Sequence, residues 1–126
     1  VGIYDSNKKE LLLSNAGHEP PLVIDKEQKF SNFSEAGPPL GITSKIKYKE
    51  TTTNFSDSSM YIFTDGITEI KSPSGDMLEV EGFQKYIKKY QHTPNNKRLK
   101  LMIEDIVKAG MIQKDDLTIV TVDSIQ

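Results

Sequence analysis

The stretch MYIFTDGITEI, residues 60–70, combines a strand pattern with a candidate site. Its first five residues, Met60 to Thr64, favour a β-strand that is apolar on both faces, as expected for a strand buried between two layers. An Asp-Gly pair then breaks the pattern, and an acidic residue follows at Glu69. Asp-Gly is an ordinary turn pair, but a carboxylate at the end of a buried strand can also bind a hard metal ion. The stretch alone leaves both interpretations of Asp65 open.

The composition bounds the class of protein. The chain has 126 residues, which suits a single domain with a modest core, and its 27% charged residues are typical of a globular chain. A net charge of −2 gives no electrostatic reason to expect nucleic acid or an anionic membrane as a partner. Because there is no cysteine, a metal ion would need oxygen or imidazole ligands. No apolar run could cross a bilayer and no signal-peptide pattern is present, so a cytoplasmic location is predicted.

The first half of the chain reads as short strands separated by turn residues. Alternating and β-branched residues favour strands, whereas clusters of Asp, Asn, Gly and Pro favour turns. The expected elements are a hairpin over residues 2–17, a strand over 21–25 with a partner at Lys29 to Phe33, a shaped loop over 35–42, and a strand with one wet face over 46–55.

The second half is predicted to be mainly helical. Apolar residues recur at helical spacing in two stretches, and both stripes are expected to face the core. They are Val80, Phe83, Tyr86, Ile87 and Tyr90 in the first stretch, and Leu99, Met102, Ile103, Ile106 and Val107 in the second. Thr93 is predicted to cap the second helix, with Pro94 in its first position and Gly110 beyond its end. A final strand is expected over residues 116–122. This order predicts an α+β fold, with antiparallel strands and two helices packed on one sheet face.

Two acidic segments flank predicted buried strands. Asp65 follows the strand that ends at Thr64, and the pair Asp115-Asp116 precedes the last strand. If these two strands are antiparallel neighbours, the end of one and the start of the other share an edge of the sheet, and the carboxylates converge. Such oxygen ligands suit Mg²⁺ or Mn²⁺. The alternative is that the first segment is a tight turn and the second a solvated loop.

Other catalytic schemes have weaker support. His18 lies in a turn-rich segment, where a hydrogen bond to its own loop is the simpler role, and His92 lies at a helix end, where the helix dipole accounts for it. No phosphate-binding glycine motif is present. Arg98 is the only arginine, so a phosphate site built on paired guanidinium groups is not expected.

Four segments of the chain stand out together: NAGHEPPLV (Asn15 to Val23), GPPLGI (Gly37 to Ile42), YIFTDGITE (Tyr61 to Glu69) and DDLTIV (Asp115 to Val120). In this order they resemble one family, the PPM-type metal-dependent protein phosphatases, in their stage II sporulation E-like branch, which regulates sigma factors in bacteria. The resemblance covers the whole chain but only the C-terminal part of the family's domain.

The resemblance implies a four-layer α-β-β-α sandwich with a binuclear Mg²⁺ or Mn²⁺ centre that activates water to attack phosphoserine or phosphothreonine. By similarity, Asp65 and Asp115 match metal-ligating aspartates. Asp116 is expected to orient the loop or a metal-bound water, and Gly66 to permit a sharp exit from the strand. The loops around NAGH and GPPLG would shape the rim of the site, and His18 does not transfer as a ligand.

The departures from the family pattern bear on activity. The earlier aspartate-bearing motifs of the family have no counterpart here, so residues 1–126 are expected to form one domain portion carrying about half of a binuclear site. One hypothesis is therefore the C-terminal portion of a cytoplasmic phosphatase acting on a phosphorylated regulatory protein of the anti-sigma antagonist type. The alternative is a non-catalytic, phosphatase-like interaction domain that pairs with other chains, including itself, through an open sheet edge.

Overall fold

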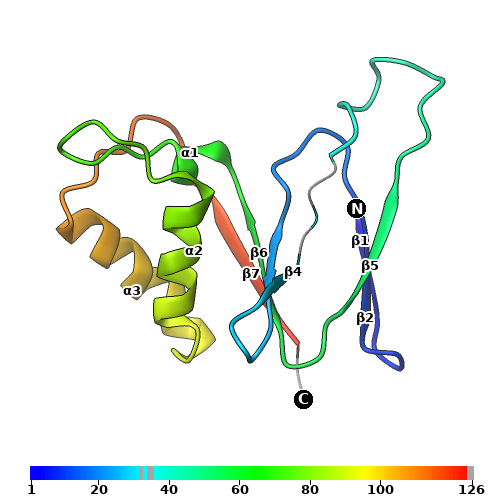
Figure 1. The fold of residues 1–126 in the computed structure, drawn as a ribbon, viewed down its shortest axis with the longest axis horizontal. Helices are drawn as coiled ribbons and strands as arrows, with labels where there is room; N and C mark the ends of the chain where they lie inside the picture. The colour runs from blue at the N-terminus through cyan, green and yellow to red at the C-terminus, as the bar shows by residue number, and fades with distance from the viewer. Residues whose placement is uncertain (32, 34–35, 125–126) are drawn as a thin grey trace. The chain divides into compact units, whose positions relative to one another are not determined.

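The computed structural model describes residues 1–31, 33 and 36–124, and Figure 1 shows its fold. The described residues form two compact units, residues 1–62 together with the segment from Thr121 onward, and residues 63–120. Antiparallel strands fill the first half and helices most of the second, so the predicted α+β class is confirmed. The elements are β1 (Gly2–Asp5), β2 (Glu10–Ser14), β3 (Leu22–Ile24), β4 (Phe30–Ser31), β5 (Glu50–Asn54), β6 (Ser59–Phe63), α1 (Asp65–Thr68), α2 (Glu79–Tyr90), α3 (Asn95–Lys108) and β7 (Ile119–Asp123).

The predicted hairpin near the N-terminus is confirmed. β1 and β2 pair antiparallel, with Tyr4 opposite Leu11, and β5 adds to the other side of β2. The turn forms because the Asp5 carboxylate accepts hydrogen bonds from the backbone N–H groups of Asn7, at 2.9 Å, and Lys8, at 3.1 Å. Along β5 the side chains alternate between exposed and half-buried, as the threonine-rich pattern predicted.

A second sheet has the strand order β4-β3-β6-β7. β3 pairs antiparallel with both β4 and β6, which confirms the strand expected around Leu22 and a short form of its predicted partner; Asn32, within that prediction, lies outside the described residues. A buried cluster draws on both sheets, because Leu11 comes from β2, Val23 from β3 and Met60 from β6. Each such side chain contributes roughly 1.5–3 kcal/mol through burial.

The two longer helices bury one face each, largely as predicted. Phe83 and Ile87 of α2 are fully buried, and the Phe83 ring meets that of Phe63 edge to face at 5.1 Å between centroids. In α3, Met102 and Ile106 are buried, but Val107 is 63% exposed, so the predicted stripe was wrong at that residue.

The start of α3 was predicted wrongly and its end correctly. The flanking residue at its start is Pro94, with φ −51° and ψ 136°, so the cap predicted at Thr93 was wrong by one residue. Arg98 is buried and its Nε donates to the Thr93 carbonyl at 3.1 Å. Gly110 follows the helix with φ +76° and donates its N–H to Val107, as predicted for a C-terminal glycine.

An ion pair joins α2 to α3 and makes the stability of the fold depend on pH in the acid range. The Lys89 ammonium donates to the Asp105 carboxylate, which, together with a hydrogen bond from Tyr90, lowers the pKa of Asp105 below its usual 3.8. A carboxyl whose pKa is lowered by folding stabilises the fold above its unfolded pKa, and this contribution is lost as pH falls through the folded pKa. We therefore expect the urea concentration at the unfolding midpoint to decrease as the pH is lowered below about 4. In Asp105→Asn this decrease should be smaller.

The matched control is Glu104→Gln. Glu104 lies on the same helix but its contact with Lys100 is long, at 3.9 Å, and exposed. Its removal is expected to leave the acid dependence unchanged. Identical acid profiles for wild type and Asp105→Asn would contradict the assignment.

Candidate metal site

The strands that carry the two acidic segments are neighbours. β7 lies beside β6 in the sheet. At one end Thr64 N donates to Thr118 O at 3.1 Å, and at the other Ser124 N donates to Ser58 O at 2.9 Å. Because residue numbers rise along one strand as they fall along the other, the pair is antiparallel. The end of β6 and the start of β7 therefore share one edge of the sheet, which is the condition predicted for the carboxylates to converge.

Thr64 connects these two strand ends through its side chain. Its hydroxyl accepts a hydrogen bond from Thr118 N at 3.1 Å and donates one to the Asp116 carbonyl at 3.3 Å. Its own carbonyl accepts the N–H of Ile67 at 3.2 Å and so begins α1. Although Thr64 occupies the N-cap position, its hydroxyl makes no capping bond and is directed to residues 116–118 instead.

Gly66 lies where the segment of Asp116 crosses α1. A Cβ at this position would lie 2.2 Å from the Asp116 carbonyl oxygen and 3.0 Å from its carbon, far inside van der Waals contact. The φ angle of Gly66 is not left-handed, since the glycines with positive φ are Gly17, Gly41, Gly75 and Gly110. The predicted reason for this glycine, a sharp exit from the strand, stays a prediction, and the structure shows a second one. Here glycine is needed for the close approach of another backbone.

The predicted carboxylates lie on these two joined segments, and all are exposed. Asp65 is the first residue of α1, and its carbonyl accepts the Thr68 hydroxyl at 3.0 Å and the Glu69 N–H at 2.9 Å. One carboxylate oxygen of Asp115 accepts the N–H of Asp116 at 2.7 Å. The hydrogen bonds of Asp116 involve its backbone, and the orienting role expected of it stays a prediction.

The donors fit a hard divalent cation in kind but not in number. Asp65 and Asp115 offer oxygen ligands from adjoining segments, as Mg²⁺ and Mn²⁺ prefer. Within the residues that the structure describes, however, no group of three or more His, Cys, Asp or Glu side chains could hold a metal ion. The described residues therefore supply part of a ligand set at most.

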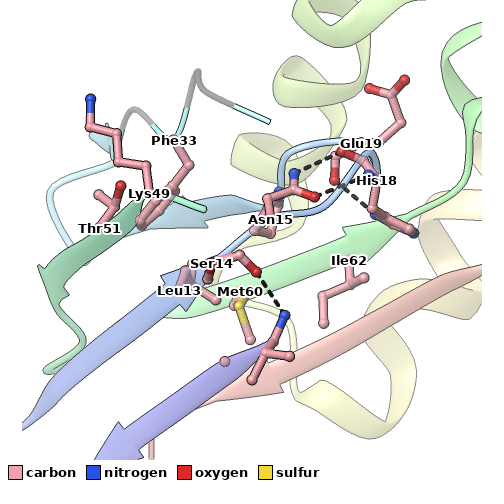
Figure 2. A pocket seen from close by; sticks show the side chains of 13 residues that line it. Leu13, Ser14, Asn15, His18, Glu19, Phe33, Lys49, Thr51, Met60 and Ile62 are labelled. Carbon is pink, nitrogen blue, oxygen red and sulfur yellow. Dashed lines mark hydrogen bonds between the residues drawn. The ribbon is translucent and has the colours of Figure 1, made fainter. Parts of the chain in front are cut away.

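Hydrogen bonds within the NAGH loop fix its shape, as Figure 2 shows. Asn15 accepts the backbone N–H of His18 at 3.0 Å through its side-chain oxygen and donates to the His18 carbonyl at 2.7 Å. The His18 ring contacts the Glu19 carbonyl at 2.8 Å through Nδ1, so His18 serves its own loop, as expected. The Asn15 carbonyl also accepts the N–H of Gly37, which holds the GPPLG loop beside NAGH.

These residues border a cavity of 360 Å³ within the first unit. Its wall is largely apolar, with Leu13, Phe33, Met60 and Ile62, and its polar residues include His18 and Lys49. The cavity contains none of the predicted metal ligands.

Thr64 is the residue that the sequence analysis missed. A hydroxyl residue directly before a candidate ligand, at a strand end, was an available signal. The partners of this hydroxyl lie more than fifty residues further along the chain, and no local pattern indicated them.

Comparison with known proteins assigns the class. The chain matches the family model of Stage II sporulation protein E (SpoIIE) over residues 1–124 and belongs to this family of phosphatase domains. A curated relative is Protein IcfG of Synechocystis sp. (strain ATCC 27184 / PCC 6803 / Kazusa), 28% identical over 129 residues, which cover 96% of this chain and 19% of the relative.

Solved structures share the fold. The SiaA-PP2C domain of Pseudomonas aeruginosa matches with a TM-score of 0.78 at 16% identity, covering 96% of this chain and 49% of that one. The manganese-presoaked phosphatase domain of the cell fate determinant SpoIIE from Bacillus subtilis matches with a TM-score of 0.69 at 16% identity, covering 100% of this chain and 56% of that one. The RsbU and RsbW domains of Rv1364c from Mycobacterium tuberculosis match at 20% identity with a TM-score of 0.69, covering 95% of this chain and 34% of that one.

The chain thus spans about half of the first two solved phosphatase domains and about a fifth of the curated relative. Among the helices of the described residues, none is long and apolar enough to cross a membrane.

Proposed function

We propose that residues 1–126 are the C-terminal portion of a PPM-type phosphatase domain, in a protein that hydrolyses phosphoserine or phosphothreonine on a regulatory protein. The observation that carries the proposal is the junction of two acidic segments at one sheet edge, where Thr64 and Gly66 bring residues 116–118 against the start of α1. The family to which the chain belongs supports the same chemistry.

In this proposal Asp65 and Asp115 each contribute a carboxylate to a metal centre whose other ligands come from outside this chain. Asp116 orients the loop through its backbone. Bound Mn²⁺ or Mg²⁺ would supply an activated water and neutralise phosphoryl charge. The all-oxygen donors support such an ion, and so does the manganese presoak of a structure with the same fold.

The proposed substrate is a cytoplasmic phosphoprotein of the anti-sigma antagonist type. The support is the family match and the likeness to a solved protein that combines RsbU and RsbW domains. A chain of net charge −2 offers no strong positive field for polyanions, so recognition of the substrate would depend on protein–protein contacts and on the metal.

The test is phosphate release by the complete protein that carries this chain. A phosphoserine or phosphothreonine peptide should be hydrolysed with Mn²⁺ or Mg²⁺ and not after chelation, whereas a matched phosphotyrosine peptide should be hydrolysed more slowly. Equal rates with and without divalent cations would overturn the proposal.

A second candidate function is a non-catalytic interaction domain. It is favoured by apolar side chains exposed on two edge strands: Ile3 (61%) and Tyr4 (41%) on β1, and Val120 (48%) and Val122 (40%) on β7. Exposed apolar edges favour pairing with another chain, including a second copy. Calorimetric titration of the complete protein with Mn²⁺ separates the candidates, since tight uptake of two ions would argue against the non-catalytic one.

A further inference from the structure

We infer that Thr64 is a positioning residue, whose hydroxyl fixes the loop of Asp115 and Asp116 relative to Asp65. This inference rests on the proposed function, because its purpose is to hold two carboxylates at one metal centre. We call Thr64, with its hydrogen bonds to residues 116–118, the Thr64 clasp.

The first step concerns the last rung of the β6–β7 ladder. In a regular antiparallel sheet, two hydrogen-bonded residues exchange both of their N–H···O=C bonds. Thr64 and Thr118 keep only half of this exchange, since Thr64 N donates to Thr118 O at 3.1 Å. The Thr64 carbonyl accepts Ile67 N instead and begins α1. The backbone therefore turns into the helix one bond before the ladder is complete.

The second step is that the Thr64 side chain replaces the missing acceptor. Its Oγ1 accepts the Thr118 N–H at 3.1 Å, within the usual range for such a bond. The hydroxyl hydrogen is directed to the Asp116 carbonyl, a longer contact of 3.3 Å. One hydroxyl thus satisfies the start of β7 and holds the loop before it, which a valine of the same shape could not do.

The third step connects the clasp to the carboxylates. Asp65 directly follows Thr64, and Asp115 directly precedes Asp116, so each predicted ligand is one residue away from a clasped group. The Asp115 carboxylate also accepts a hydrogen bond from Asp116 N at 2.7 Å, which holds it to this loop. Loss of the hydroxyl should leave both carboxylates present but free the segment of Asp115 from that of Asp65.

The test compares Thr64→Val, which keeps the shape and removes the hydroxyl, with Thr64→Ser, which keeps the hydroxyl. The readout is the amide exchange rate of Thr118 divided by that of Phe83 in α2, measured by NMR without metal. We expect Thr64→Val to raise this ratio about tenfold, because the Thr118 N–H loses its acceptor, and Thr64→Ser to restore it. An unchanged ratio in Thr64→Val overturns the inference, including the case in which a general loss of stability raises both rates together.

A second measurement separates this inference from the proposed function. Mn²⁺ added to the wild-type chain should broaden the amide signals of Asp65 and Asp115 together, and in Thr64→Val this coupled response should be lost, with the Asp65 signal still affected. A raised exchange ratio with no Mn²⁺ broadening at either aspartate in the wild type would leave the clasp standing and overturn the metal role of the pair.

Discussion

Asp65→Asn is expected to reduce metal-dependent phosphate release by the complete protein by about 100-fold or more, since in the proposed site a neutral amide would replace an anionic metal ligand. The change is nearly isosteric, and the Asp65 carboxylate is exposed, so little stability should be lost. The backbone carbonyl of Asp65, which accepts from Thr68 and Glu69, is unaffected by the substitution. The loss should appear in kcat/KM at saturating Mn²⁺, with thermal unfolding measured alongside.

The matched control is Glu69→Gln. Glu69 is an exposed acid at the C-terminal end of α1, four residues after Asp65, and its charge is removed in the same way. We expect near wild-type activity from this variant, because Glu69 has no assigned contact with the metal. Equal losses in the two variants would indicate a general charge effect, and full activity in Asp65→Asn would remove Asp65 from the site.

The approach of the acidic segments was predictable because it followed from two strand patterns. An apolar run ending at Thr64 and a β-branched run starting near Leu117 predicted buried strands, and their ends carried the acids. The burial was wrong for β7, an edge strand on which Val120 and Val122 are exposed. The remaining condition, that the strands be antiparallel neighbours, is met in the structure. The two longer helices of the second half were predictable for a similar reason, since helical periodicity over twelve residues or more is a strong local signal.

What the sequence did not predict depends on partners far along the chain. The single-turn helix α1 forms because the Thr64 carbonyl leaves the strand ladder and accepts Ile67 N. Its four residues are too few for an apolar periodicity to predict a helix. Val107 fits the helical stripe of α3 but lies on an exposed flank, while Arg98 is buried instead. Local periodicity defines the apolar face of a helix only approximately, and the neighbouring elements decide which flank is covered.

The reason for Gly66 was hidden in the same way. An Asp-Gly pair predicts a turn from local chemistry. The structure instead shows a backbone carbonyl, from a residue fifty positions later, within 2.2 Å of the place where a Cβ would lie. No pattern within the stretch MYIFTDGITEI carries that information.

Gly66→Ala is accordingly expected to act on both stability and the site. Because the atom in conflict is a backbone carbonyl, the added methyl cannot be accommodated by a side-chain rotation, and residues 115–117 must move away from α1. We expect the free energy of unfolding to fall by about 1–3 kcal/mol, as in overpacked cores. Displacement of Asp115 from Asp65 should also weaken Mn²⁺ binding by the complete protein, measured by titration at a temperature where the variant is folded.

Gly82→Ala is the matched control, since Gly82 is also a helical glycine with little room. There the added Cβ would lie 2.6 Å from Leu78 Cδ1, which is the end of a flexible side chain and can rotate away. Alanine is also favoured over glycine inside a helix by roughly 1 kcal/mol, so the net change at Gly82 should be small. The same substitution thus distinguishes a glycine required by a neighbouring backbone from one that is only crowded. Equal stability and equal Mn²⁺ affinity in the two variants would show that the Asp116 loop is not held against α1 in solution, and the closeness of the two acidic segments would then lose its support.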